Sequence, residues 1–117
     1  MALSSGLLLG LSGCDKPPNT PATTAATVTI TAAGVSPKNV QVAPGSRVLF
    51  VNNDSQEHYI HSDPHPDATD CPEMNLIGIL KTGERRETGN LVDTTTCGYH
   101  DHNIPANNSF KGTIVIK

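Results

Sequence analysis

Apolar and polar residues alternate along much of the chain with the period of two that is typical of half-buried strands. In residues 27–32, valine and isoleucine alternate with threonine, and Val40 and Val42 repeat the pattern. Residues 47–51 form a nearly continuous apolar run of strand length, which favours a central position in a sheet. The first half of the chain therefore predicts strands rather than helices.

Further strand-like runs follow, and residues that favour turns separate the runs. They cover residues 58–61, 76–80, 85–91, 94–99 and 112–117. Turn-forming residues occur at Pro44 and Gly45 and again at residues 52–55. No apolar spacing of helical period extends over a useful length. The pattern predicts an all-β domain of about seven to eight short strands, arranged as a two-sheet sandwich.

The N-terminal segment differs in composition from the rest of the chain. Residues 1–14 contain a short apolar run that ends in Leu-Ser-Gly before Cys14, which resembles a bacterial lipobox. We expect residues 1–14 to be a lipoprotein signal segment with Cys14 lipidated, and residues 15–26 to be a flexible Pro/Thr-rich tether. The domain, residues 27–117, would then be exported to the periplasm or another extracytoplasmic space and anchored to the membrane. The alternative is an apolar N-terminus with a free thiol, because the segment before Cys14 contains no Lys or Arg.

The charge of the chain argues against one class of partner, and its composition limits the residue types that can form the core. The net charge of -3 and the scattered positions of the basic residues argue against nucleic-acid binding. The chain has no Trp and few other aromatic residues, so the core must consist mainly of valine, isoleucine and leucine, which suits strands. With Cys14 assigned to lipidation, Cys71 and Cys97 remain of the three cysteines.

All five histidines lie in two short segments. The first segment holds His58, His61 and His65, and the second holds His100 and His102. The residues between these segments are strand-like and could bring the two together at one end of a small β domain. Clustered imidazoles are the pattern of a metal site, and they suit copper and zinc.

The spacing of these residues resembles the cupredoxin family. The resemblance consists of Val-x-Val-x-Pro-Gly at residues 40–45, an Asn/Asp turn before His58, a late Tyr-His-Asp-His at residues 99–102, and the terminal run 111–116. It covers residues 27–117, nearly the whole expected domain. It implies a Greek-key β-sandwich that holds copper at one end, and His58 matches the first ligand position of the family.

The second half of the motif departs from the blue-copper members of the family. Cys97-x2-His100 matches the beginning of their ligand loop, but no Met follows. Tyr99 matches the inward-facing aromatic that precedes the ligand cysteine by two residues, which puts Asp101 at the cysteine position. The motif is closer to the Tyr-His-x-His of the copper-binding first domain of multicopper oxidases. The resemblance therefore implies copper held by His58, His100 and His102.

In this interpretation neither Cys71 nor Cys97 binds the metal ion, so the two can pair with each other. In an exported domain we expect a disulfide between Cys71 and Cys97. The alternatives are that Cys97 binds copper as a thiolate, or that both thiols are free. His61 and His65 stay open as further ligands; His61 lies three residues after His58, which on a strand puts it on the opposite face.

The resemblance implies a function in copper handling or electron transfer, with a redox or copper-donor/acceptor protein as partner, and no enzymatic activity. One alternative is a blue-copper electron carrier that uses His58, Cys97 and His100. Another is a metal-free sandwich that serves as an interaction module. The choice between copper and zinc also stays open at this point.

Overall fold

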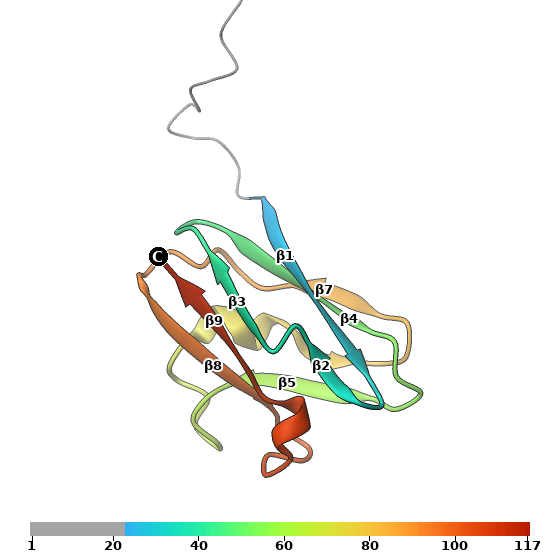
Figure 1. Cartoon of the computed structure of the whole chain (residues 1–117). Coiled ribbons are helices and arrows are strands. Elements are labelled where there is room, and N and C mark those ends of the chain that lie inside the picture. Colours follow the sequence, from blue (N-terminus) through green and yellow to red (C-terminus); the bar gives the residue numbers. More distant parts are fainter. Residues whose placement is uncertain (1–22) are drawn as a thin grey trace, which may run out of the picture.

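The computed structural model describes residues 23–117. The predicted signal segment with Cys14, and residues 15–22 of the predicted tether, lie outside the described residues. Within the described range the chain forms nine strands and short 3-10 helices (Figure 1). The strands are β1 (Thr24–Thr31), β2 (Gly34–Ser36), β3 (Asn39–Val42), β4 (Arg47–Asn52), β5 (His58–Ser62), β6 (Gly78–Leu80), β7 (Arg85–Glu87), β8 (Thr95–Asp101) and β9 (Gly112–Ile116). The helices are η2 (Pro72–Leu76), between β5 and β6, and η3 (Asn108–Phe110), just before β9.

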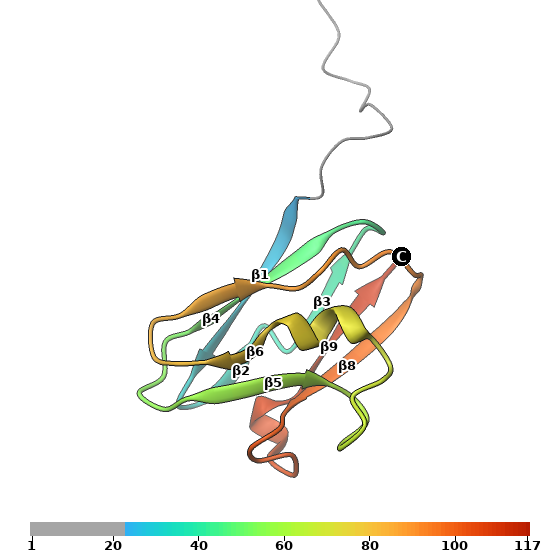
Figure 2. The ribbon, with the colours of Figure 1, turned by 180° about the vertical axis from the view of Figure 1, so that it is seen from behind.

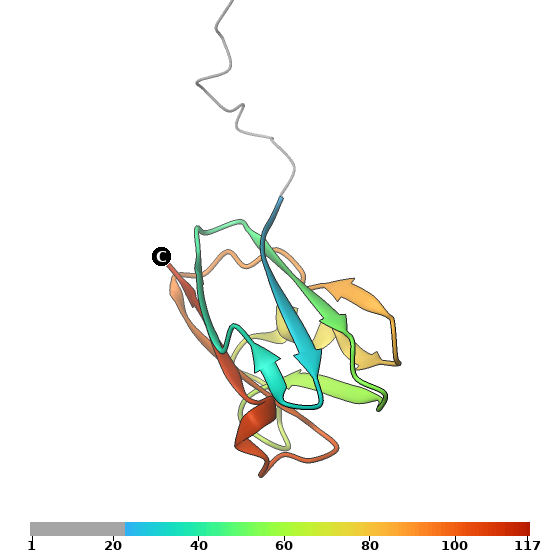
Figure 3. The ribbon, with the colours of Figure 1, turned by 45° about the vertical axis from the view of Figure 1, so that its right-hand side comes forward.

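The strands form two sheets that pack face to face (Figure 3). The four-stranded sheet has the order β2-β1-β4-β7, and the five-stranded sheet has the order β3-β9-β8-β5-β6. β1 runs parallel to β4 and β3 runs parallel to β9, whereas the other neighbours are antiparallel. The predicted all-β sandwich is confirmed. The described residues hold nine strands where we expected about seven to eight, because the short edge strand β2 gave no strand-like pattern in the sequence.

The core lies between the sheets and is built from alternate residues of the strands. Val28, Ile30, Val48 and Phe50, from β1 and β4, are fully buried. Across the core, the rings of Phe50 and Tyr99 meet edge to face, with their centres 5.1 Å apart and their planes at 86°. Such a pair contributes about 0.5–1.5 kcal/mol beyond the burial of its area. Tyr99 therefore faces inward, as the resemblance to cupredoxins implied.

β1 begins earlier than the expected domain boundary. Thr24 pairs with Arg47 and Ala26 pairs with Val48, with a shift of register between the two pairs. The strand thus starts inside the segment that we expected to belong to the tether. The polar threonines and small alanines of this segment gave no apolar signal, but β4 supplies a backbone partner for them.

The long segment between β5 and β6 is tied to β8 by a disulfide. Cys71, immediately before η2, is joined to Cys97, with the two Cα atoms 5.7 Å apart. Both residues are buried, and η2 lies close to β5 and β6 (Figure 2). The predicted disulfide is present, so Cys97 offers no free thiolate in this structure.

Arg86 closes the open side between the two sheets. It lies on β7, the edge strand of the smaller sheet, and donates hydrogen bonds from Nη1 to the carbonyl oxygens of Ile77 and Ile79, at 2.5 and 2.9 Å. Ile79 belongs to β6, the edge strand of the larger sheet. The guanidinium therefore occupies backbone acceptors that would otherwise be open to another chain.

Among residues 23–117 there is no helix with the length and apolar character needed to cross a membrane.

Candidate metal centre

The pairing of β5 with β8 decides which histidines share a face. In this antiparallel ladder His61 is opposite His100, and Ile60 is opposite Asp101. Directly opposed residues project to the same side of a sheet, and successive residues of a strand project to opposite sides. His61 and His100 therefore lie on the outer face of the larger sheet. His58 lies on the inner face with Ile60 and Asp101.

Four histidines gather on the outer face. His102 follows β8, and His65 comes from the loop after β5. The ring centres of His61 and His102 are 4.9 Å apart, those of His65 and His102 are 4.7 Å apart, and those of His65 and His100 are 5.4 Å apart. His100 and His102 are 5.8 Å apart by the same measure. We call His61, His65, His100 and His102 the outer histidine cluster.

Three nitrogens of the outer histidine cluster are buried without any hydrogen-bond partner. They are Nδ1 of His61, Nε2 of His100 and Nδ1 of His102. A buried polar atom without a partner costs about 1–3 kcal/mol, so native structures contain few of them. Burial, followed by the nearby His102 and His100, lowers the pKa of His61 below its usual 6.5. His61 therefore favours the uncharged imidazole, the form that binds metal ions.

A carboxylate fixes the orientation of one of these rings. Nδ1 of His100 donates a hydrogen bond to Oδ1 of Asp63, with 2.7 Å between the two atoms. An ionised carboxylate only accepts, so the hydrogen of a neutral His100 is on Nδ1, and Nε2 carries the lone pair. Asp63 is the first residue after β5 and is partly exposed.

The loop that carries Asp63 and His65 is held at several points. The amide of Asp63 donates to the carbonyl oxygen of Gly98 at 3.0 Å, and the amide of Asp70 donates to the carbonyl oxygen of Asp63 at 2.9 Å. The disulfide at Cys71 then anchors the end of the loop to β8. His65 is exposed, and its ring reaches both His100 and His102.

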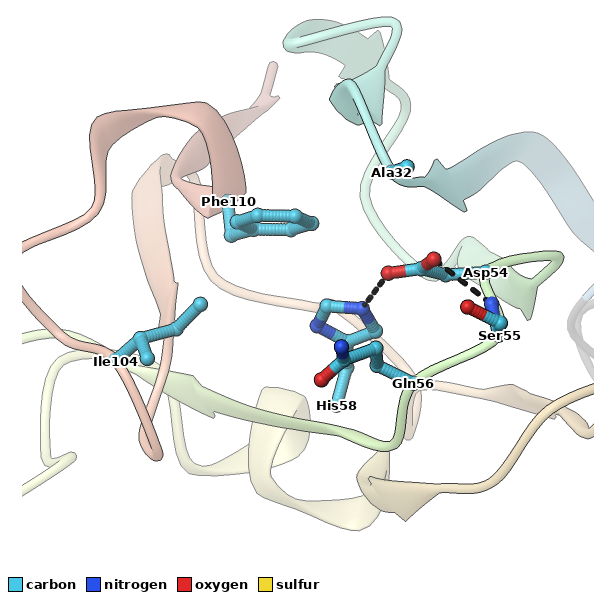
Figure 4. Close-up of a pocket in the computed structure, with 7 residues that line it drawn as sticks. All are labelled: Ala32, Asp54, Ser55, Gln56, His58, Ile104 and Phe110. Atoms are coloured by element: carbon cyan, nitrogen blue, oxygen red, sulfur yellow. Dashed lines mark hydrogen bonds and ion pairs between the residues drawn. The ribbon is translucent and has the colours of Figure 1, made fainter.

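His58 occupies a different environment on the inner face. Its Nε2 is 2.7 Å from Oδ2 of Asp54 (Figure 4). Its Nδ1 is 2.6 Å from Oδ2 of Asp101. Its ring stacks on Phe110, with the centres 4.6 Å apart. A carboxylate oxygen thus engages each ring nitrogen of His58 in this arrangement. Neither nitrogen faces an open position where a metal ion could bind. We call Asp54, His58 and Asp101 the inner triad.

The inner triad is satisfied by its surroundings. Oδ1 of Asp101 accepts hydrogen bonds from the amides of Tyr59 and Asn103, at 3.2 and 2.9 Å. The hydrogen bond from His58 lowers the pKa of Asp54 below its usual 3.8, although burial acts in the opposite direction. A hollow of about 280 Å³ opens beside the triad, between Phe110 and the turn that follows β4 (Figure 4). Its lining consists of Ala32, Asp54, Ser55, Gln56, His58, Ile104 and Phe110.

The structure brings together only part of the predicted ligand set. His100 and His102 lie in one cluster, whereas His58 lies on the opposite face of the sheet with both nitrogens engaged. His61 and His65, which the sequence left open, join the cluster. The signal for His61 was its place three residues after His58, but the sequence did not show which of the two faces His100. Asp101 is an inward polar group satisfied by hydrogen bonds.

The outer histidine cluster fits an ion that prefers imidazole. With a metal–nitrogen bond of about 2.0 Å, the centres of two imidazoles that share an ion are roughly 4.4–5.4 Å apart for bond angles of about 90–120°. The observed separations of 4.7 to 5.8 Å are close to this range. Within residues 23–117, no three His, Cys, Asp or Glu side chains already stand in metal-ligand geometry. Binding therefore requires the imidazole rings to turn toward a common point.

Comparison with known proteins gives a likeness in fold. No family model matches the chain, and no curated protein matches it in sequence. A purple cupredoxin from Nitrosopumilus maritimus is 22% identical, with a TM-score of 0.61 over 79% of this chain and 99% of that chain. Plastocyanin from Dryopteris crassirhizoma is 17% identical, with a TM-score of 0.61 over 78% and 99%. An amicyanin variant in its Cu(I) form is 19% identical, with a TM-score of 0.64 over 80% and 82%. The domain therefore has a cupredoxin-like fold.

Proposed function

We propose that this protein binds copper outside the cytoplasm through the outer histidine cluster and serves in copper handling. The observation that carries the proposal is the group of three buried imidazole nitrogens without partners, on His61, His100 and His102. The fold supports it, because one of the similar solved structures is described as a Cu(I) protein. In the inner triad, by contrast, carboxylate oxygens already engage both nitrogens of His58.

The donor set favours copper among the available ions. His61, His100 and His102 would hold the ion, and His65 would close the site from the loop. Imidazole donors suit both Cu(II) and Zn(II), and the affinity order of divalent ions places copper above zinc. Bound copper would supply a tightly held divalent centre, and the protein residues would select, orient and shield it.

The same donor set argues for handling rather than fast electron transfer. A blue-copper centre uses a thiolate and a weak axial methionine. Cys97 is in the disulfide, and Met74 is packed in the core. The copper form should therefore lack an intense thiolate absorption band. A copper-donor or copper-acceptor protein is the partner that this role requires.

Copper titration of matched variants tests the proposal. Isothermal titration of the purified domain with Cu(II) should give one site in the wild type. Replacing one ligand, as in His61→Gln, His100→Gln or His102→Gln, should weaken binding by more than roughly 100-fold, since even outer-shell changes cost 10–100-fold. The control is Asp54→Asn on the inner face, with His58→Gln as a second inner variant once its fold has been verified, and both should keep the affinity.

Two results would contradict the proposal. If the inner variants lost copper while the outer variants kept it, the site would be the inner triad. If the folded wild type bound neither copper nor zinc at micromolar concentrations, the sandwich would be a metal-free interaction module.

We further propose that the domain is exported and tethered to the membrane through lipidated Cys14. The lipobox-like sequence before Cys14 supports this proposal, as does the disulfide, because such bonds persist in oxidising compartments. Fractionation of cells that express the full chain should place it with membranes. Cys14→Ser should release it or stop its processing, and an unchanged distribution would refute the tether.

A further inference from the structure

We propose that Asp63 is the residue that positions His100 for metal binding, and that Gly98 provides the space in which Asp63 does so. The inference rests on the proposed copper site. It also predicts a property of the protein without metal, so that this inference and the copper proposal can fail separately.

Gly98 leaves a gap on the outer face of β8 beside His100. Alternate residues of a strand share a face, so the outer row of β8 and its extension consists of Gly98, His100 and His102. A Cβ atom at Gly98 would lie only 2.3 Å from Oδ2 of Asp63 and 3.2 Å from its Cγ. The Asp63 carboxylate therefore fills the place that a side chain at this position would take.

The backbone of Asp63 is held where the carboxylate needs it. Its amide donates to the carbonyl oxygen of Gly98 at 3.0 Å. Its own carbonyl oxygen accepts from the amide of Asp70 at 2.9 Å and from the hydroxyl of Ser62 at 3.0 Å. With both backbone groups engaged, the short Asp side chain has little freedom, and its carboxylate stays against β8.

This placement determines which nitrogen of His100 is available. The hydrogen bond from Nδ1 to Asp63, at 2.7 Å, keeps the hydrogen on Nδ1. Nε2, which is buried and has no partner, is left with the lone pair. A carboxylate behind a metal-bound imidazole also makes the ring a stronger donor. Asp63 should therefore favour divalent copper over Cu(I) and lower the reduction potential of the site.

The first test uses the protein without metal. Long-range ¹H–¹⁵N NMR of the imidazoles should show His100 in the Nδ1–H tautomer in the wild type. In Asp63→Ala this preference should be lost, and the Nε2–H tautomer should appear. Asp67→Ala is the matched control, since it removes the same charge from an exposed position of the same loop and should leave the tautomer unchanged.

The second test measures copper affinity and reduction potential. Asp63→Ala should weaken Cu(II) binding by about 10–100-fold, the usual cost of losing such a partner. Asp63→Asn can still accept the hydrogen bond but has no charge, so it should keep more of the affinity while raising the potential. Gly98→Ala should displace the carboxylate and weaken binding as Asp63→Ala does. The double variant should then be no weaker than either single variant.

The outcomes separate the two proposals. An unchanged His100 tautomer in Asp63→Ala would overturn the role of Asp63, whatever the copper result. So would a copper affinity and potential that Asp63→Ala and Asp67→Ala alter equally. If the wild type bound no copper but lost the tautomer in Asp63→Ala, the copper proposal would fail while the positioning of His100 by Asp63 would stand.

Discussion

The inner triad and the outer histidine cluster are neighbours in sequence and lie on opposite faces of the same two strands. On the inner face, His58 meets two carboxylates, and both of its nitrogens are hydrogen bonded. On the outer face, His61 and His100 meet other imidazoles, and each keeps a buried nitrogen without a partner. An odd separation along β5, three residues from His58 to His61, thus divides a histidine with both nitrogens hydrogen bonded from histidines that keep nitrogens without partners.

The inner triad also occupies the place where the resemblance to cupredoxins implied copper. Asp101 stands at the position expected for a ligand cysteine, and it accepts a hydrogen bond from His58 at 2.6 Å. An internal hydrogen bond therefore joins the residues at two positions where a blue-copper site would have ligands. If copper binds the outer histidine cluster as we propose, a shared fold does not fix the face of the sheet on which the metal is held.

The largest expected effect is the difference in stability between two His→Gln variants of β5. His58→Gln leaves two buried carboxylates without the group between them, and breaking such a buried pair costs about 3–5 kcal/mol. His61→Gln, on the outer face, should change the free energy of unfolding of the metal-free protein by less than about 1 kcal/mol. Urea denaturation measures both. Equal losses would remove the distinction between the two faces.

Loss of the disulfide should lower the stability of the protein. It should also disturb the outer histidine cluster more than the inner triad. Replacing both Cys71 and Cys97 with serine should lower the free energy of unfolding by roughly 3 to 4 kcal/mol, given the 26-residue separation. It should also weaken copper binding, because the loop with Asp63 and His65 loses an anchor. The NMR signals of His58 should stay in place in the folded variant. A shifted His58 with unchanged copper affinity would contradict the expectation.

Copper itself should stabilise the protein through one face only. At a free concentration about 100 times the dissociation constant, a ligand that binds only the folded state adds about 2.7 kcal/mol. We expect this gain in the wild type and in Asp54→Asn, and its absence in His61→Gln and in His102→Gln. Thermal unfolding with and without Cu(II) measures it. A gain that Asp54→Asn abolished would transfer the site to the inner face.

The two faces should respond to acid in different pH ranges. The pKa of His61 is lowered in the folded protein, so below about pH 6.5 the unfolded chain takes up a proton that the folded protein does not. Stability of the metal-free protein should therefore fall as the pH decreases below that value, and less so in His61→Gln. The pKa of Asp54 is lowered below 3.8, so its contribution is lost only in stronger acid. Urea denaturation from about pH 8 downward should resolve the two ranges. Identical profiles for the wild type and His61→Gln would refute the expected contribution of His61.

The sequence predicted the sandwich because its strands alternate clearly, and the resemblance to cupredoxins placed Tyr99 inward. It also put His100 and His102 in one ligand set. It could not show that His61, rather than His58, lies on their face, because that depends on the pairing of His61 with His100 across strands far apart in the chain. His65 and Asp63 were beyond local pattern, since their positions depend on how a proline-rich loop folds back onto β8. The carboxylates around His58 likewise come from separate segments.

Arg86 has a consequence for how another protein can approach. Its guanidinium holds the backbone acceptors of Ile77 and Ile79 along the free border of the larger sheet. Backbone pairing by an incoming chain would first have to displace that cation, so extension of the sheet at this border is disfavoured. At this border a visiting protein would have to bind through side chains rather than by adding a strand.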